Sequence, residues 1–165
     1  MGLAREELQH RVDDMACGDH QKQLESLSGL RAAVSRLELK SYRRRILCAE
    51  DHEDTREFLV IWLGLAGYEV TPVKNIAECV EVAVSFRFDL YLISERFPDG
   101  WGFELAAEIR SFDRHTPLVF HSAQAYQKDI ERAMNAGAQA YITKPSDPER
   151  LVETIRQLIN ANDRA

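Results

Sequence analysis

Short apolar runs alternate with stretches of helical periodicity from residue 45 onward. Five of these runs are typical of strands, and they span residues 46–49, 68–71, 90–93, 118–120 and 141–142. The run at 90–93 lacks polar alternation, as is typical of a central strand covered on both faces. Strands that alternate with helices in this way predict an α/β fold, a doubly wound parallel sheet with helices on both faces.

Helical periodicity fills the segments between the strands. The first helix is expected at about residues 54–66, with Gly67 as its C-terminal cap. Its apolar residues recur at i, i+3, i+4 and i+7 and are Phe58, Ile61, Trp62 and Leu65. Further helices are expected around residues 76–84, after Gly102, at about 126–136 and from residue 146 onward. The last begins with Ser-Asp-Pro-Glu at 146–149, a capping box with a first-turn proline.

An N-terminal extension, residues 1–44, precedes the α/β domain, which we place at residues 45–162. Apolar residues recur at threes and fours in the extension and predict a helix at about 21–39. Part of this stripe fits two heptads, too few to establish a coiled coil. The helix is therefore a candidate for dimerisation or partner docking, and packing onto its own domain is an equal alternative.

Charge is distributed unevenly along the chain. Residues 1–45 carry nine Lys/Arg and seven Asp/Glu, a net +2, whereas residues 46–165 carry twelve and twenty, a net −8. An acidic domain argues against nucleic acid as the partner, because nucleic-acid binding depends on basic patches. The basic triplet Arg43–Arg45 is interpreted first as a solvated junction, with a contact to an acidic partner or nucleic acid as the alternative.

The cysteines and the lengths of the apolar runs indicate where in the cell the protein is expected. Cys17, Cys48 and Cys79 form no CxxC pair, and reduced, buried thiols are the simplest interpretation. No apolar run is long enough to cross a membrane, and the N-terminus lacks a signal-peptide core. We therefore expect a soluble, cytoplasmic protein.

Polar residues directly follow four of the predicted strands. They are Glu50-Asp51, Ser94, Ser122 and Lys144-Pro145. Parallel strands bring their C-terminal ends to one edge of the sheet, where ligand sites form. Acid, hydroxyl and amine groups that are far apart in the sequence should therefore meet in one pocket.

In order and spacing, these motifs resemble the receiver domain of response regulators, the CheY-like family, from about residue 45 to 160. The third strand reads Asp89, four apolar residues, Ser94 and then a loop with Pro98, Asp99 and Gly100. Ser122-Ala123, Ala136-Gly137-Ala138, Tyr141 and Lys144-Pro145 follow in the family's order. The resemblance implies a flavodoxin-like, five-stranded parallel sheet and a role in two-component, phosphorelay signal transduction.

The resemblance also assigns roles to the residues at the strand ends. Glu50 and Asp51 match the acidic pair that binds Mg²⁺, a cation that prefers oxygen ligands. Lys144 and Ser122 match the groups that hold the phosphoryl oxygens, and Ser122 is the switch hydroxyl. Tyr141 matches the aromatic residue whose rotation accompanies the switch. Pro145 is a candidate for a cis peptide bond.

Ser94 departs from the family, because it stands where the phosphate-accepting aspartate is expected. The change removes an anionic ligand, so Mg²⁺ binding should be weak or lost. It also supplies an alcohol, which needs a base before it can attack phosphorus. Glu95 should face away from Asp51 and Lys144, because adjacent strand residues point to opposite faces. Glu95, Glu50 or Asp51 as a substitute acceptor is a minor alternative.

The same residues also permit a purely structural interpretation. Lys144 can pair directly with Asp51 and Glu50 in a static cluster of charges, so that its removal would destabilise the fold. Ser122 can be an ordinary hydrogen-bonded hydroxyl, and Tyr141 a partly buried core aromatic. The sequence leaves both interpretations open.

Three further residues have chemistry that could serve another role. His52 and His121, with the acidic pair, offer enough ligands for Zn²⁺. However, His121 should point away from Ser122, and His52 should be solvated. Trp101 stands between two glycines beside the expected pocket and either packs over its loop or contacts a partner.

We therefore predict a single-domain, degenerate receiver that acts by protein–protein interaction and is not an enzyme. The expected partner is a sensor histidine kinase or a downstream signalling protein, with no membrane and no nucleic acid. A homodimer is an alternative, through the N-terminal helix or through the fourth helix, fifth strand and fifth helix. Competing hypotheses are a response regulator with a non-standard acceptor and a metal-dependent hydrolase on the same scaffold.

Overall fold

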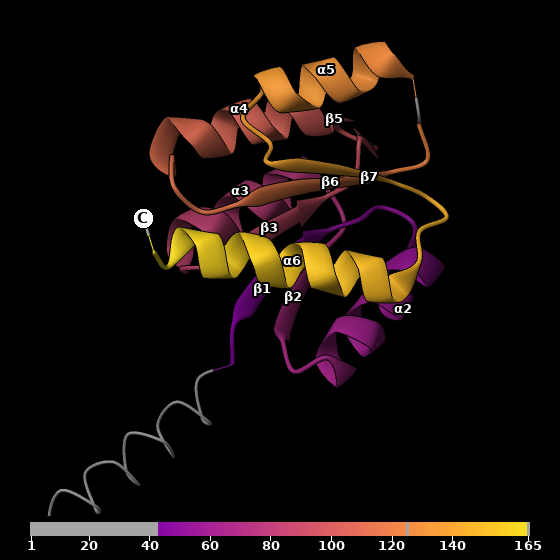
Figure 1. Ribbon diagram of the computed structural model, residues 1–165. Helices are drawn as coiled ribbons and strands as arrows, with labels where there is room; N and C mark the ends of the chain where they lie inside the picture. Colours follow the sequence, from indigo (N-terminus) through magenta and orange to yellow (C-terminus); the bar gives the residue numbers. More distant parts are fainter. Residues whose placement is uncertain (1–42, 125, 165) are drawn as a thin grey trace, which may run out of the picture. The chain divides into compact units, whose positions relative to one another are not determined.

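The computed structural model describes residues 43–124 and 126–164, and its centre is a parallel five-stranded sheet (Figure 1). The strand order is β2-β1-β3-β6-β7, and every neighbouring pair is parallel. The strands are β1 Arg45–Ala49, β2 Glu69–Val73, β3 Leu90–Ile93, β6 Leu118–Ser122 and β7 Ala140–Thr143. The predicted doubly wound α/β fold is confirmed.

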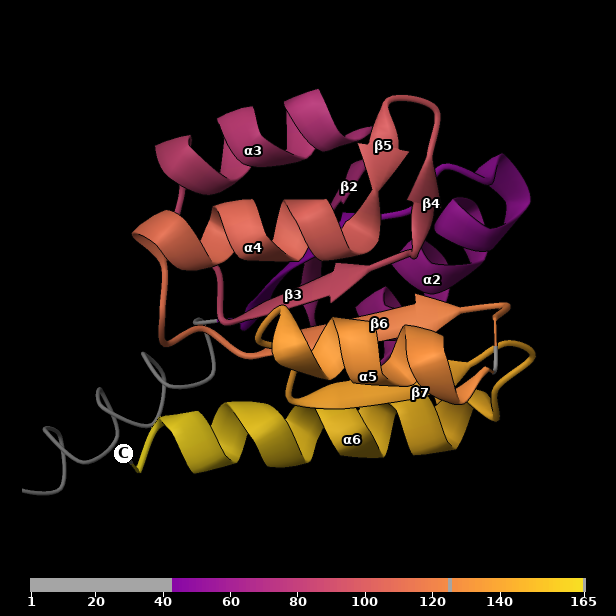
Figure 2. The same cartoon turned by 90° about the horizontal axis from the view of Figure 1, so that it is seen from above.

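Five described helices cover the two faces of the sheet. They are α2 Glu53–Leu65, α3 Ile76–Ser85, α4 Gly102–Phe112, α5 Gln127–Asn135 and α6 Pro148–Asn162. Figures 1 and 2 show α2 and α6 on one face and α3, α4 and α5 on the other. The expected N-terminal helix at about 21–39, the dimerisation assigned to it, and Cys17 lie outside the described residues.

The apolar core lies in two layers because successive strand residues point to opposite faces. Ile46 and Cys48 of β1 pack with α2 and α6, whereas Leu47 and Ala49 pack with α3, α4 and α5. All four residues of β3 are buried, as predicted for a central strand. Each large apolar side chain that becomes fully buried contributes roughly 1.5–3 kcal/mol.

The first helix forms where it was expected, but its apolar stripe faces solvent. Leu59 and Leu63 are its buried residues, whereas Phe58, Ile61 and Leu65 are 47%, 63% and 80% exposed. Helical periodicity thus identified the helix without identifying the face that packs on the sheet.

The start of the last helix also differs from the prediction. Asp147, not Ser146, is the N-cap, and its carboxylate accepts a hydrogen bond from the Glu149 amide at 2.9 Å. Pro148 occupies the first turn as expected. The Ser146 hydroxyl is instead hydrogen-bonded to His121 Nε2, 2.9 Å away. The competing hydrogen bond explains why the serine does not cap the helix.

A short antiparallel hairpin follows β3 and was not predicted. It consists of β4 Arg96–Phe97 and β5 Gly100–Trp101. Figure 2 shows the hairpin beyond the end of β3, beside the starts of α3 and α4. It therefore lies next to the strand ends that were expected to form the site.

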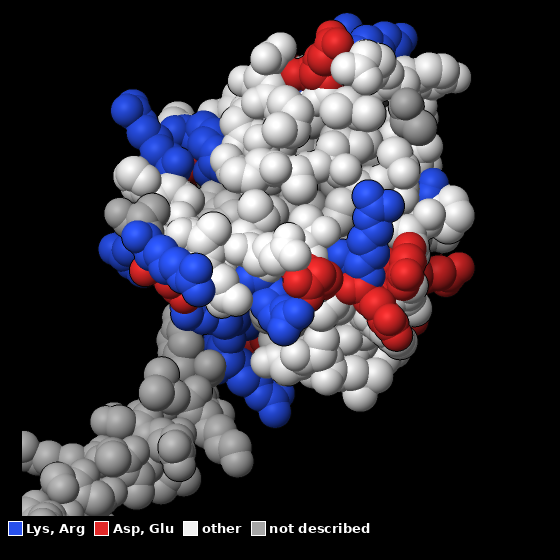
Figure 3. Space-filling view, in the orientation of Figure 1, with Lys and Arg blue, Asp and Glu red and all other residues white. Residues whose placement is uncertain are grey.

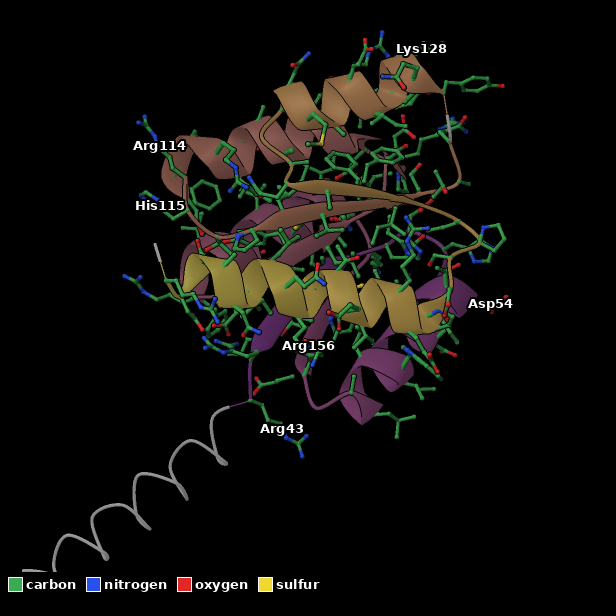
Figure 4. The ribbon with its side chains drawn as sticks, viewed as in Figure 1. Arg43, Asp54, Arg114, His115, Lys128 and Arg156 are labelled. Atoms are coloured by element: carbon green, nitrogen blue, oxygen red, sulfur yellow. The ribbon has the colours of Figure 1, made fainter. Side chains whose placement is uncertain are left out.

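The basic triplet at the start of the described chain forms mainly intramolecular contacts. Arg44 pairs with Asp89 and Asp163, and Arg45 Nε lies 3.2 Å from Glu69 Oε1. In Figure 4 Arg43 projects away from the sheet. These contacts favour the interpretation of the triplet as a junction.

Figure 3 shows charges of both signs on the face that carries α6, with basic groups mostly on the left and acidic groups mostly on the right. Among the described residues, no helix is both long and apolar enough to span a membrane.

The cysteines of the described part match the prediction of buried thiols. Cys48 and Cys79 are free and fully shielded from solvent. Burial raises the pKa of each thiol to about 12. Because the thiolate is the reactive form, both residues should be chemically inert.

Candidate functional site

A pocket of about 260 Å³ lies at the C-terminal ends of the strands. The strand-end residues singled out in the sequence line it together, and they are Glu50, Asp51, Ser94, Ser122 and Lys144. Glu95 lines it as well. The convergence follows from the parallel topology, which places the ends of β1, β3, β6 and β7 at one edge.

Ser94 lies at the floor of the pocket, directly after β3, and is 7% exposed. Its backbone amide donates to the Ala49 carbonyl oxygen at 2.9 Å, which continues the pairing of β3 with β1. Within the described residues, no hydrogen bond engages its hydroxyl. No group that could act as its base is therefore hydrogen-bonded to the serine in the described structure.

Glycine at position 102 allows α4 to begin against the residues that follow β3. A Cβ atom there would lie 2.1 Å from the Ser94 carbonyl oxygen and 3.1 Å from Glu95 Cα. The Gly102 amide donates to the Glu95 carbonyl oxygen at 2.7 Å. This close approach fixes the backbone on which Ser94 and Glu95 are mounted.

Lys144 is paired with Glu50 inside the pocket. The Nζ and Oε2 atoms are in direct contact, and the side chains are 19% and 3% exposed. The other Glu50 oxygen accepts a long hydrogen bond from the His52 amide at 3.3 Å. The pair is thus the static charge cluster that the sequence allowed, except that Asp51 is not part of it. Asp51 is exposed at the pocket mouth.

Glu95 points into the pocket, which contradicts the prediction that it would face away. It is 6% exposed, and its Oε2 atom accepts a hydrogen bond from Ser122 Oγ at 2.7 Å. The alternation argument fails because β3 ends at Ile93, so residues 94 and 95 no longer follow strand geometry. The turn toward the hairpin directs the Glu95 side chain into the pocket.

Tyr141 belongs to the same network. Its hydroxyl lies 2.9 Å from the Gln124 carbonyl oxygen and 3.3 Å from Glu95 Oε2, and its ring stacks on Phe120. A phenol has one proton to donate, so the shorter bond to Gln124 dominates and the bond to Glu95 is secondary. Burial raises the pKa of Tyr141, and the negative charge of Glu95 adds to the shift.

The network joins the segment after β3 to β6, β7 and the loop before α5. Ser122 Oγ donates to Glu95 and accepts a hydrogen bond from the Gln124 amide at 3.1 Å. Ser122 and Tyr141 are therefore neither an isolated strand-end hydroxyl nor a plain core aromatic. Both are directed toward one buried carboxylate.

The two histidines singled out in the sequence take no part in this network, although His52 lines the pocket. His121 is on the opposite side of β6 from Ser122, as predicted, and it contacts Ser146 of the loop before α6. Burial lowers the pKa of His121 to about 4, and the charge of Lys144 acts in the same direction. Its Nδ1 atom is buried without a hydrogen-bond partner in the described structure. His52 is exposed.

The oxygen donors at the pocket do not fit a divalent cation well. Both Glu50 oxygens already accept contacts, the Glu95 carboxylate is engaged by Ser122 and Tyr141, and Ser94 contributes no charge. Asp51 is the one remaining carboxylate of the pocket. In the described ranges, no group of three or more His, Cys, Asp or Glu residues could hold a metal ion. The peptide bond between Lys144 and Pro145 is cis.

Comparisons with known proteins bear on this geometry. The family model for the response regulator receiver domain matches residues 46–156. The chain is 34% identical over 113 residues to the response regulator protein PilR of Pseudomonas aeruginosa, covering 68% of this chain but only 25% of that relative. It is 30% identical over 118 residues to the polar-differentiation response regulator DivK of Brucella anthropi, covering 70% of this chain and 96% of the relative.

Solved structures agree with the sequence comparison. A CheY-like receiver domain protein from Methanospirillum hungatei is 26% identical, with a TM-score of 0.72 over 74% of this chain and 98% of the other. The chemotaxis protein CheY4 of Vibrio cholerae is 25% identical, with a TM-score of 0.68 over 71% and 99% of the two chains. The match of fold, strand-end residues and sequence leads to one conclusion: the chain belongs to the response regulator receiver domain family.

Proposed function

We propose that this chain is a degenerate receiver of two-component signalling, which acts by protein–protein contact without accepting a phosphoryl group. The observation that carries the proposal is the Glu95 carboxylate, which lies inside the pocket, accepts a hydrogen bond from Ser122 Oγ at 2.7 Å and lies 3.3 Å from the Tyr141 hydroxyl. By resemblance to the family, these are the residues that respond to a phosphoryl group. Here they have a permanent anionic partner supplied by the chain.

Two further features support the absence of phosphorylation. Ser94 takes the acceptor position by resemblance, and a phosphoserine would be a stable ester, unsuited to rapid switching. Lys144 is paired with Glu50, and the other charged residues that line the pocket are Asp51, Glu95 and Arg96, so the lining carries more carboxylates than cations, which weakens its attraction for an incoming phosphoryl group. The protein therefore needs no catalytic step, and Mg²⁺ binding should be weak or lost.

The contact surface we assign to the output is the face of α5, β7 and α6. Tyr141 lies on β7, and the Ser122–Gln124 segment leads toward α5, so the network ends at this face. Receiver domains interact with sensor histidine kinases and downstream effectors, and a protein of one of these kinds is the proposed partner. A second copy of the chain is the alternative occupant of this face.

Intact-mass spectrometry after incubation with acetyl phosphate and Mg²⁺ tests the proposal. The native chain should gain no phosphoryl mass, whereas a Ser94→Asp variant serves as a control in which the family's acceptor is restored. A native chain that gains one phosphoryl group would contradict the proposal. Loss of that group in Asp51→Ala or in Glu95→Gln would then locate the substitute acceptor.

A further inference from the structure

We propose that the hairpin β4–β5, together with the first turn of α4 and the outer side of α5, binds an acidic segment of a partner protein. The proposal deepens the interaction role proposed above and rests on it. Its core is a stack of four side chains, Arg96, Trp101, Phe103 and Arg132, which we name the Trp101 stack.

The Trp101 stack is continuous across four elements. The Arg96 guanidinium lies 5.3 Å from the centre of the Trp101 ring, and the Trp101 and Phe103 rings are 5.9 Å apart and inclined by 20°. The Arg132 guanidinium lies 5.8 Å from the Phe103 ring. The order is therefore cation, ring, ring, cation, with one residue each from β4, β5, α4 and α5. Each of these contacts is attractive, which holds the stack in place.

The backbone beneath the stack is also fixed. Arg96 and Trp101 are paired across the hairpin, and the Trp101 amide donates to Glu104 Oε2 at 3.0 Å. At the hairpin tip, the Asp99 carboxylate accepts hydrogen bonds from the amides of Ile76 and Ala77 at 3.0 and 3.1 Å. The hairpin is thus tied to the starts of both α3 and α4.

Trp101 is nevertheless 42% exposed, so a rigid aromatic surface faces solvent. Binding to a surface that is already ordered costs little conformational entropy. Tryptophan and arginine are also the residues most often found at the energetic centre of protein interfaces. Packing of Trp101 over its loop and contact with a partner, the two interpretations that the sequence offered, are therefore compatible.

The two guanidinium groups at the ends of the stack are the groups that would receive an anionic partner. Asp99 and Glu104 keep their negative charge but are held by backbone amides of α3 and of the hairpin, and Asp129 is buried. Within the described structure, no hydrogen bond or ion pair engages the Arg96 guanidinium, whereas Arg132, 62% exposed, forms a long ion pair with Asp129 at 4.0 Å. A stacked guanidinium keeps the N–H groups in its plane available, and these match a carboxylate in a bidentate geometry.

The overall charge decides between a peptide and a nucleic acid. Residues 46–165 carry a net charge of −8, which repels a polyphosphate chain at long range. A short peptide with a few carboxylates meets much less of this repulsion. The order of the stack then specifies the occupant: an apolar side chain against the exposed edge of Trp101, flanked by acidic side chains that face Arg96 and Arg132.

Selection of peptides from a random display library on the full chain tests this inference. The selected sequences should be enriched in Asp and Glu around an apolar residue. A fluorescently labelled synthetic copy should bind about tenfold or more weakly to Trp101→Ala and to Arg96→Gln. Arg114→Gln is the matched control, because Arg114 is an exposed arginine that follows the C-terminal end of α4, whereas the hairpin lies at its N-terminal end, and it should bind as the native chain does.

Several results would overturn the inference. The selection could recover no peptide, or the recovered peptides could share a neutral or basic consensus. The peptide could also bind Trp101→Ala and Arg96→Gln as tightly as it binds the native chain. Binding of a single-stranded oligodeoxythymidylate that requires Arg96 would assign the surface to nucleic acid. Dissociation of a dimer by Trp101→Ala in sedimentation would assign it to a second copy. None of these results changes the outcome of the phosphorylation assay, so the two proposals fail separately.

Discussion

The hydrogen bond between Ser122 and Glu95 should be measurable as a coupling energy. The bond is short, 2.7 Å, and both residues are buried, at 2% and 6% exposure. Hydrogen bonds to charged groups contribute about 1.5–3 kcal/mol. Because Glu95 and Ser122 also make other contacts, single substitutions would mix several effects. A double-mutant cycle separates the pairwise contribution from the rest.

The cycle compares the native chain with Glu95→Ala, Ser122→Ala and the double variant by urea unfolding. We expect the double variant to lose about 1–3 kcal/mol less unfolding free energy than the sum of the losses in the two single variants. The reason is that removal of either partner already breaks the bond. A second cycle with Tyr141→Phe should give a smaller coupling, because the Tyr141 hydroxyl lies 3.3 Å from Glu95 and retains Gln124 as a closer acceptor.

Additive losses, within about 0.5 kcal/mol, would refute the role assigned to Glu95. A coupling for Tyr141 larger than that for Ser122 would show that the order inferred from the distances is wrong. Glu95→Gln is a useful control, since an amide oxygen still accepts the Ser122 proton. It should lose less stability than Glu95→Ala if the hydrogen bond, rather than charge alone, is responsible.

Three other substitutions test the surroundings of the pocket. Lys144→Met should lower the free energy of unfolding by about 3 kcal/mol in urea titrations, because it leaves Glu50 buried without its partner; recovery in the double variant with Glu50→Gln is expected, and a neutral effect would contradict the pairing. His121 has a pKa of about 4 in the folded chain against 6.5 in the unfolded chain, so the neutral ring is favoured by folding. Its contribution to the free energy of unfolding, roughly 3 kcal/mol, should be complete above pH 6.5 and should be lost as the pH falls from 6.5 through 4. In His121→Asn this loss should be smaller, and an unchanged pH profile would oppose the assignment. Gly102→Ala should destabilise the fold by about 1–3 kcal/mol, because its Cβ would meet the Ser94 carbonyl oxygen at 2.1 Å; an equally stable variant would show that α4 can shift.

The fold and the meeting of the strand-end residues could be predicted because both depend on simple rules. Strand-helix alternation specifies a parallel sheet, and a parallel sheet brings Glu50, Ser94, Ser122 and Lys144 to one edge. These rules need only the order of the elements. They hold even where the predicted boundaries differ by one or two residues from those observed.

The role of Glu95 could not be predicted, because it depends on where β3 ends. Alternation places residue 95 on the far face only if the strand continues, and the strand stops at Ile93. Pro98, Asp99 and Gly100 indicate a turn, but they do not specify at which residue β3 ends before it. The direction of the Glu95 side chain thus depends on whether the strand continues past Ile93.

The face of α2 was ambiguous for a different reason. Its sequence carries apolar residues on two sides, so periodicity alone fits either Leu59 and Leu63 or Phe58, Ile61 and Leu65 toward the sheet. Only packing against β1 and α6 decides between them.

The central claim is that the network of Glu95, Ser122 and Tyr141 is already engaged and does not respond to a phosphoryl group. Beryllofluoride with Mg²⁺, a phosphoryl mimic, tests this claim when amide resonances are followed by NMR. The account predicts that the resonances of Ser122, Tyr141 and α5 stay in place when beryllofluoride is added to the native chain, whereas Glu95→Ala, which removes the acceptor of the Ser122 hydrogen bond, displaces them without beryllofluoride. Saturable shifts of these resonances in the native chain would contradict it.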